Sequence, residues 1–475
     1  MPVAHQWRPI EDLGENPKSL TDGELIALKR VWADQKAELT QAGTLDEFDK
    51  RLRREWAIET GIIENVYTLD RGVTKTLIEK GIEAALIPHG ASNRDPERVA
   101  RIIQDHYDAL EGMFDFVGGQ RDLTTGYVKQ LHAALLRNQD TYTVVDQLGQ
   151  AFEKPLEKGL YMNTPNSPTR PDGAIHEYCP PEHVASEMDR LIVLHREHAA
   201  RDVPPEVEAA WLHHRFTQIH PFADGNGRVA RAIASLVFIK AGWFPLIVKR
   251  DDWARYIDEL EKADAGDLRP LVAMFVESQR TALIQATELV YELKPITSPH
   301  EAIAAAKDRL MQRGKLPLKE WLAAKETAKK LQLLAAQRFD EVAAELNREI
   351  ASPRKGISFT AMGEDGINAL FVTKKAVLDA GHVADFAEFA AWANLVLNAG
   401  SQVTLALSFH AIGPRFRGLV GVVAYLETQD PDPILLNDGA FLINYAEDLA
   451  TVQSRFSTWL ERVIVEGLNQ WRRTL

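Results

Sequence analysis

One turn that passes directly into a helix, between residues 220 and 242, constrains the fold of this chain more than any other stretch. Its first part reads HPFADGNGRVAR, in which Gly-Asn-Gly at residues 225 to 227 forms the turn. The apolar positions that follow are Val229, Ile233, Leu236 and Val237. They recur at the spacing of one helix face, and Gly242 is a suitable residue at which that helix ends. The sequence therefore predicts a helix that begins directly after a glycine-rich loop.

Two arginines lie at the start of this helix, where positive charge is unfavourable. Arg228 and Arg231 are three residues apart, so they share one face of the first turn. That turn already presents unpaired N–H groups and the positive end of the helix dipole. A bound anion would offset the repulsion, because backbone N–H groups at a helix N-terminus bind phosphate. The pattern therefore predicts a polyphosphate site.

Two further side chains add chemistry to the same loop. Asp224 supplies a carboxylate oxygen of the kind that holds Mg²⁺ together with phosphate oxygens. His220 supplies a base whose ordinary pKa lies near neutrality, which suits it to take a proton from a hydroxyl group. A phosphate cradle, a metal ligand and a base together indicate nucleotide chemistry.

Three other interpretations of the glycine-rich turn fit the sequence less well. A hairpin turn does not explain the helix and the paired arginines that follow it. A calcium loop that begins at Asp224 needs an acidic residue at its twelfth position, which is Ser235. The spacing of Gly225, Gly227 and Ala230 matches a dinucleotide-binding fingerprint, but no buried strand precedes it. The phosphate site at a helix start remains the better explanation.

Residues 220 to 231 match, position by position, the signature H-x-F-x-D/E-G-N-G-R-x-x-R of Fic (fido) domain proteins. The surrounding sequence is similar to that family over roughly residues 50 to 285. The resemblance implies a helical core with a small β-hairpin called the flap. It implies nothing about residues 300 to 475.

By this resemblance the activity is AMP transfer from ATP to a side-chain hydroxyl of a target protein, with Mg²⁺ as cofactor. His220 would deprotonate the hydroxyl, and Asp224 would hold the metal ion. Arg231 would bind the γ-phosphate. A glycine at position 227 favours nucleotidyl transfer, since relatives that transfer phosphate have lysine there. The ATP-binding residues that the resemblance implies are Gly225, Asn226, Gly227, Arg228, Arg231 and Tyr256.

Two parts of the implied site lie outside the motif. The hairpin expected over residues 159 to 181 resembles the family's flap, which holds the target segment as an added strand. Tyr256 falls where the family contributes an adenine-pocket residue, whereas Asp264 stands where some relatives have asparagine. The flap residues that would bind a target are Ile175, His176, Glu177 and Tyr178.

An inhibitory pattern precedes the core. Thr60, Glu64 and Asn65 fit S/T-x-x-x-E-G/N, which one regulated class of Fic proteins carries N-terminal to the core. We hypothesise that Glu64 pairs with Arg231, occupies the γ-phosphate position and turns ATP away from a productive pose. The enzyme is therefore expected to be autoinhibited.

Composition limits the partners of the chain, whose 475 residues are enough for about three domains. A net charge of -13 makes it a poor candidate for binding nucleic acid or an anionic membrane surface. The lone Cys179 excludes an internal disulfide, and the first residues lack the pattern of a signal peptide, so we expect a cytoplasmic location. The expected partners are ATP and a target protein with an accessible Tyr, Ser or Thr hydroxyl. The sequence leaves self-modification and a homodimer open.

The expected fold class is mainly α: a Fic-type helical core with a small β-hairpin flap, followed by a C-terminal α+β domain. Five parts are expected: an N-terminal helical region with the inhibitory motif (1–115), the Fic catalytic core (116–292), a linker (293–300), a long helical segment (301–350) and an α+β domain of unknown role (351–475). In this last domain, residues 367–377, 402–412 and 416–427 resemble strands, and residues 383–399 and 447–468 resemble helices.

Two other functions stay open at this stage. The first is the reverse reaction, in which Glu64 would activate water to remove AMP from a modified protein. The second is a nucleotide-binding regulatory adaptor without turnover. The intact His220 argues against the adaptor, because a protein that only binds ATP needs no base.

Overall fold

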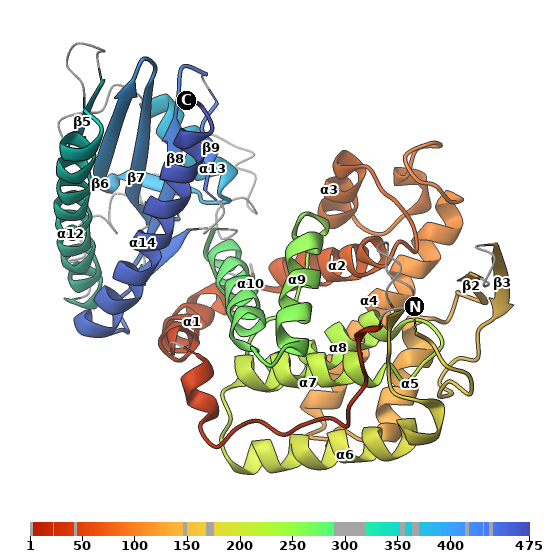
Figure 1. Cartoon of the computed structure of the whole chain (residues 1–475). Coiled ribbons are helices and arrows are strands. Elements are labelled where there is room, and N and C mark those ends of the chain that lie inside the picture. The colour runs from red at the N-terminus through yellow and green to blue at the C-terminus, as the bar shows by residue number, and fades with distance from the viewer. Residues whose placement is uncertain are drawn as a thin grey trace. The chain divides into compact units, whose positions relative to one another are not determined.

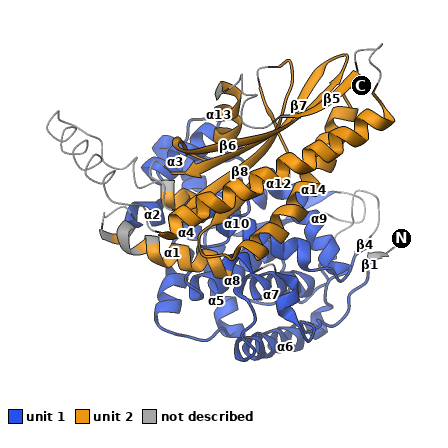
Figure 2. Ribbon diagram, turned by 90° about the vertical axis from the view of Figure 1, so that its left-hand side faces the viewer, with its two compact units in different colours: residues 1–25, 45–282 blue, residues 26–44, 283–475 orange. Residues whose placement is uncertain are grey.

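The computed structural model describes residues 3–21, 23–41, 45–145, 150–167, 175–288, 319–351, 357–362, 370–413, 418–430, 432–436 and 440–475 (Figure 1). The chain forms two compact units, residues 1–25 with 45–282 and residues 26–44 with 283–475, which Figure 2 draws in two colours. The predicted class, mainly α with a small hairpin and a C-terminal α+β part, is confirmed. The linker predicted at residues 293–300 lies outside the described residues. No helix in the described ranges is long and apolar enough to cross a membrane.

The part expected to be an N-terminal helical region (1–115) is mainly helical in its described residues. Helix α4 shows how the local sequence starts a helix. Asp95 caps its first turn by accepting a hydrogen bond from the Arg98 N–H at 3.0 Å, and Pro96 occupies the position where no N–H is needed. The helices of this part are η1 (Pro17–Leu20), α1 (Glu24–Gln41), α2 (Leu45–Ile63), α3 (Arg71–Lys80), η2 (Ala84–Leu86) and α4 (Pro96–Gly118). Most of α1 belongs to the second unit, and the others belong to the first.

A central helix organises the rest of the first unit. The helices are α5 (Thr125–Leu135), α6 (Pro181–Ala200), α7 (Pro205–Ile219), α8 (Asn226–Lys240), η3 (Arg250–Asp252), α9 (Trp253–Asp264) and α10 (Arg269–Glu288). Helix α8 packs against α4, α5 and α7 and is buried on nearly every side. Its small residues Ala230, Ala232 and Ala234 let these neighbours approach closely. Arg228 and Arg231 therefore begin a helix that solvent scarcely reaches.

The strands of the first unit differ from the prediction. They are β1 (Val3–His5), β2 (Thr141–Val145), β3 (Ala151–Pro155) and β4 (Ile175–His176). Among the described residues the antiparallel hairpin is β2–β3, and residues 168–174 of the predicted hairpin lie outside the described residues. The described part of 159 to 181 contains one short strand, β4, which pairs in parallel with the N-terminal strand β1. Sequence periodicity could not predict this pairing, because the two strands are short and far apart in the chain.

The second unit is a sheet covered by helices on both faces. Its strands run antiparallel in the order β10-β8-β7-β6-β5, with β9 paired to β8. Helices α12 and α14 pack on one face of the sheet, and α13 packs on the other (Figure 1). The elements are α12 (Lys319–Glu349), β5 (Ile357–Met362), α13 (Leu370–Asp379), β6 (Ala384–Ala399), β7 (Gln402–Ile412), β8 (Leu419–Glu427), β9 (Ile434–Leu435), β10 (Phe441–Asn444) and α14 (Leu449–Arg472). For the long helical segment predicted at 301–350, a helix is confirmed at 319–349, and residues 301–318 lie outside the described residues. The strands near 402–412 and 416–427 and the last helix are also confirmed.

The helix predicted at residues 383–399 is wrong, because these residues form strand β6. Their Ala, Leu and Glu content favours a helix, but burial follows a period of two. The side chains that face the core shared with α12 and α14 are Phe389, Ala391, Ala393, Leu395 and Leu397. Pairing with β5 and β7 on both edges overrides the local propensity.

The strand predicted at residues 367–377 is also wrong. Helix α13 begins at Leu370, and Thr373, Ala376 and Val377 are buried at helical spacing. Its β-branched and aromatic residues favour a strand. In the structure one face of the helix, with Ala376 and Val377, packs on the sheet.

Candidate active site

His220 lies at the point where helix α7 ends. Its backbone is left-handed (φ 53°, ψ 56°), which is uncommon outside glycine and marks a strained position. Nδ1 lies 3.2 Å from the carbonyl oxygen of Thr217, so Nδ1 carries the proton and Nε2 keeps a free lone pair. The ring of Tyr178 stacks on the imidazole at 3.8 Å. Burial lowers the pKa of His220 to about 4, so the imidazole is a neutral base near pH 7.

The turn after His220 is held by one side chain. The amide of Asn226 accepts a hydrogen bond from the Phe222 N–H at 2.9 Å and donates one to the Phe222 carbonyl at 2.7 Å. These two hydrogen bonds hold the loop against the start of α8. Gly225 has φ 80°, and a Cβ there would lie 2.7 Å from the side chain of Leu136. The turn thus needs both a glycine and an asparagine in this order.

Gly225→Ala is expected to reduce the free energy of unfolding by about 2 to 4 kcal/mol, from the left-handed backbone and the collision with Leu136. Urea unfolding followed by circular dichroism measures the change. Gly112→Ala is the matched control, because Gly112 is exposed inside helix α4 with nothing within 4 Å of the new Cβ. That control should stabilise the chain by roughly 0.5 to 1 kcal/mol. Equal effects of the two variants would contradict the requirement for glycine in the turn.

Arg231 is almost completely buried and paired with the predicted inhibitory residue. Its guanidinium donates to Glu64 Oε1 at 2.7 Å and to the Thr60 carbonyl at 3.3 Å. Burial alone would lower the pKa of Arg231, but Glu64 and Tyr256 raise it above its ordinary value. A Cβ on Gly227 would collide with the Glu64 carboxylate. The carboxylate therefore lies directly on the first turn of α8, where an anion is expected.

Arg228 is held by a different pair of groups. It donates to Gln139 Oε1 at 2.7 Å and to Asp224 Oδ2 at 3.3 Å. Gln139 Nε2 also donates to Asp224 Oδ2, at 2.5 Å. Burial lowers the pKa of Arg228 despite the nearby Asp224 and Glu64. The Nε atoms of Arg228 and Arg231 are buried with no hydrogen-bond partner among the described residues, so the pair retains capacity for an anionic ligand.

Residues 122–238 match the family model described as Fic/DOC family. The chain contains a Fic domain. The chain is 33% identical over 226 residues to "Protein adenylyltransferase fic-1" of Caenorhabditis briggsae, an alignment that covers 46% of this chain and 38% of the relative. It is 29% identical over 154 residues to "Protein adenylyltransferase Fic" of Nematostella vectensis, covering 30% of this chain and 34% of the relative. The chain thus spans well under half the length of these curated relatives.

One solved structure that aligns with this chain is that of a Fic domain containing signaling protein from Bacteroides thetaiotaomicron. It aligns with 55% of this chain and 96% of its own, at 22% sequence identity and a TM-score of 0.44.

His132 holds the loop of the 220–231 motif through hydrogen bonds and ring stacking. Its Nδ1 accepts a hydrogen bond from the Gly159 N–H at 2.8 Å, so Nε2 carries the proton that is donated to the Asp224 carbonyl at 3.0 Å. The imidazole stacks on Phe222 at 3.9 Å. Burial lowers the pKa of His132 to about 4, which keeps it neutral. This histidine positions the loop and is not placed to act on a substrate.

Tyr256 is buried beside Arg231 rather than on an open face of the Fic domain. Its hydroxyl lies 2.7 Å from His213 Nε2. Burial raises the pKa of Tyr256 to about 12, so the hydroxyl remains protonated. Its predicted role next to the adenine stays a prediction, and its contacts place it within the same cluster as Glu64.

The flap residues predicted to bind a target are divided between two contacts. Ile175 and His176 pair with β1, and the Glu177 N–H donates to the His5 carbonyl at 2.9 Å. The ring of Tyr178 instead stacks on the imidazole of His220. One edge of the flap strand β4 is therefore occupied by the chain's own strand β1.

Gln139 is the member of the site that sequence reasoning missed. It joins Arg228 to Asp224 from the segment after helix α5. A glutamine outside the motif carries no spacing signal, and only the packing of α5 against α8 brings it near.

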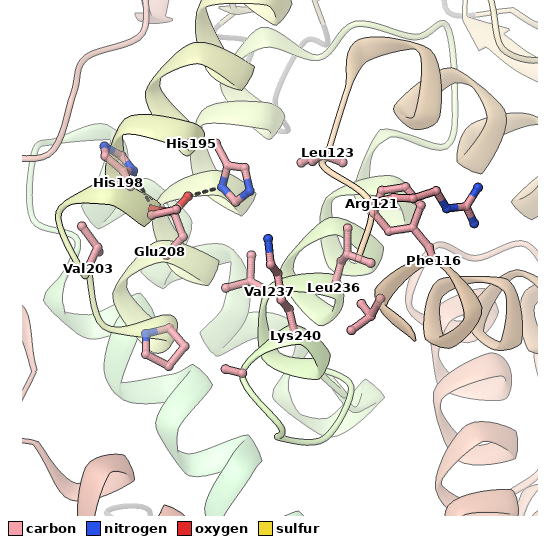
Figure 3. Close-up of a pocket in the computed structure, with 14 residues that line it drawn as sticks. Phe116, Arg121, Leu123, His195, His198, Val203, Glu208, Leu236, Val237 and Lys240 are labelled. Carbon is pink, nitrogen blue, oxygen red and sulfur yellow. Dashed lines mark hydrogen bonds and ion pairs between the residues drawn. The ribbon is translucent and has the colours of Figure 1, made fainter. Parts of the chain in front are cut away.

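A separate cavity of about 230 Å³ lies elsewhere in the Fic domain and contains no residue of the 220–231 motif (Figure 3). Its walls are mostly apolar, and Lys240 reaches one side of it. Glu208 lies between two imidazoles, 2.6 Å from His195 Nδ1 and 2.5 Å from His198 Nδ1. Its carboxylate is thus fully engaged by the two histidines. This arrangement links helices α6 and α7.

Proposed function

We propose that this chain is a protein adenylyltransferase that moves AMP from ATP to a side-chain hydroxyl of a protein. One observation carries the proposal: two buried guanidinium groups and a helix start converge with a histidine whose Nε2 is unprotonated. The names of the relatives support the same reaction. Phosphoryl chemistry of this kind depends on positioning and charge neutralisation, which these groups supply.

Atoms and charge balance in the proposed step. The hydroxyl oxygen attacks the α-phosphorus of ATP while His220 Nε2 accepts the hydroxyl proton. The bond between the α-phosphorus and the bridging oxygen breaks, and pyrophosphate leaves. Arg228 and Arg231 stabilise the negative charge on the leaving phosphates.

The residues also fit Mg²⁺ bound with the nucleotide. Asp224 presents a carboxylate that is 35% exposed beside the first turn of α8. Oxygen is the donor that this hard cation prefers. The ion would neutralise phosphate charge there, and Asp224 is the residue that would hold it.

We further propose that Glu64 keeps the enzyme in a resting state. Its carboxylate takes the Arg231 guanidinium that a γ-phosphate would otherwise bind, at 2.7 Å. A buried charge pair contributes little net stability but is well suited to a switch.

The proposal is tested by incubating the purified chain with ATP and Mg²⁺ and analysing it by mass spectrometry. An AMP adduct on a Tyr, Ser or Thr side chain is the expected result, in the chain itself or in added protein. Adducts that carry phosphate alone, or none in any variant, would contradict the proposal.

AMP transfer is expected to remain constant with pH above about pH 5 and to fall below it. Only the unprotonated His220 accepts a proton, and burial lowers its pKa to about 4, so the base is lost only in acid. Initial rates between about pH 4 and about pH 8, measured with saturating ATP, check this. A midpoint near the ordinary histidine pKa, roughly 6.5, would mean that the imidazole is not buried during turnover.

A further inference from the structure

Three metal-ligating side chains from distant parts of the sequence meet beside the flap. They are His5 at the end of β1, His176 in β4 and Asp264 at the last residue of α9. One nitrogen or carboxylate oxygen of each lies within 4.8 Å of the other two. All three belong to the first unit, and none belongs to the 220–231 motif.

The β1–β4 pairing sets the positions of the two histidines. His5 is the register partner of His176 in this parallel pair. Their imidazoles stack with centroids 4.5 Å apart and an angle of 15° between the rings. The two rings thus lie together on one side of the strand pair, next to the end of α9.

One ring nitrogen at this position is unsatisfied. His5 Nε2 is buried and has no hydrogen-bond partner among the described residues. A buried polar atom without a partner is unfavourable and requires an explanation, such as an unseen ion. Two imidazoles and a carboxylate form a ligand set that suits Zn²⁺ and similar transition metals. The set does not suit Mg²⁺, which prefers oxygen alone.

Asp264 is already oriented by a fourth residue. The buried His214 donates from Nε2 to Asp264 Oδ1 at 2.9 Å. An outer residue that fixes a metal ligand in this way is a regular feature of protein metal sites. The carboxylate therefore needs little rearrangement to present an oxygen toward the two imidazoles.

We propose that His5, His176 and Asp264 bind one transition-metal ion of the Zn²⁺ class, with water completing a tetrahedron. Bonds of about 2.0 to 2.2 Å would bring the three donor atoms to roughly 3.4 Å from one another. The two stacked imidazoles would turn out of their parallel arrangement so that one nitrogen of each points at the ion. The ion would link the N-terminal strand, the flap strand and α9 at a single point.

Metal binding would hold β1 along the flap. The His5 carbonyl accepts the Glu177 N–H at 2.9 Å, so fixing the His5 side chain also fixes this backbone pair. On the proposed function, the bound ion would keep the flap edge closed to a target strand. This consequence rests on that function, whereas the metal site itself does not.

Cobalt binding tests the site without any activity measurement. The untagged full chain is titrated with Co²⁺, which takes the place of Zn²⁺ and gives visible absorption bands in a tetrahedral site. We expect one equivalent to produce these bands and Zn²⁺ to abolish them by displacement. His5→Ala and Asp264→Asn should each lose the bands, with unchanged far-ultraviolet circular dichroism as the check on folding.

The matched control is His195→Ala, which removes an imidazole from the other histidine–carboxylate cluster of this unit. It should keep the bands of the unchanged chain. Bands that survive in His5→Ala, bands lost only in His195→Ala, or no bands at all would overturn the proposed site.

Hydrogen exchange provides the second measurement. Adding Zn²⁺ should slow exchange of the Glu177 amide in the unchanged chain and leave it unaltered in Asp264→Asn. If Zn²⁺ left exchange of the Glu177 amide unaltered in both chains, the proposal that the ion holds β1 along the flap would be refuted. If the chain showed both the cobalt bands and the slowed amide exchange but no AMP transfer, the proposed transferase activity would be refuted. The proposed metal site would still stand.

Discussion

Glu64→Gly is expected to increase AMP transfer from ATP on the order of 10- to 100-fold, the usual size of coupling between two competing ligands. Glu64 pairs with the Arg231 guanidinium, which is only 1% exposed. On the proposed function, the γ-phosphate competes for the same guanidinium. Removing the carboxylate leaves this cation for the nucleotide alone. It also clears the space over Gly227, where the carboxylate now lies.

Labelling with ATP that carries the label on the α-phosphate measures the effect directly. Glu64→Gln separates charge from size, because it keeps the length of the side chain and removes the anion; an intermediate rate is expected. Glu55→Gln is the matched control, since Glu55 on helix α2 pairs with Lys249 at 3.0 Å, away from the arginines. Equal labelling of the unchanged chain and Glu64→Gly would contradict the proposal that Glu64 keeps the enzyme in a resting state.

The same variant should change stability in a way that depends on the nucleotide. Without Glu64 the buried Arg231 has no anion beside it, and breaking a buried pair costs about 3 to 5 kcal/mol. On the proposed function, ATP would restore an anion to that position. The thermal midpoint of Glu64→Gly should therefore lie below that of the unchanged chain, and ATP should raise it more in the variant. If ATP raised the thermal midpoint by the same amount in both chains, this would contradict the proposal that Glu64 and the γ-phosphate share one position.

The sequence was sufficient for the centre of the site because the motif is local. A turn, a helix start and two arginines within twelve positions determine their own geometry, and the structure has them together on α8. The pairing of Glu64 with Arg231 was predicted from a resemblance, and the structure has the two side chains in contact. The ligand roles of these residues remain predictions.

The parts that could not be predicted depend on distant contacts. Gln139 reaches Arg228 only through the packing of α5 on α8. The flap strand pairs with β1, which lies about 170 positions earlier in the chain, a separation beyond any local pattern. Strand β6 shows the same limit, because its composition favours a helix and its neighbouring strands impose a sheet.

His220→Ala is expected to lower the rate of AMP transfer by about 10²- to 10⁴-fold while ATP binding is retained. The His220 imidazole keeps Nε2 unprotonated, since Nδ1 donates to the Thr217 carbonyl. The unprotonated Nδ1 of His132, by contrast, is occupied by the Gly159 N–H. The phosphates would contact the arginines and the turn amides instead. Loss of the base thus affects the chemical step and not the affinity for ATP.

The experiment is best made in the Glu64→Gly background, where the starting rate is highest. Initial rates give the catalytic effect, and isothermal titration with ATP and Mg²⁺ gives the dissociation constant. His89→Ala is the control, because His89 is exposed in the N-terminal helical part of the first unit. A rate that survives in His220→Ala would mean that another group takes the hydroxyl proton. Loss of ATP binding in the same variant would place the imidazole in the nucleotide site, and the assignment of His220 as the base would fail.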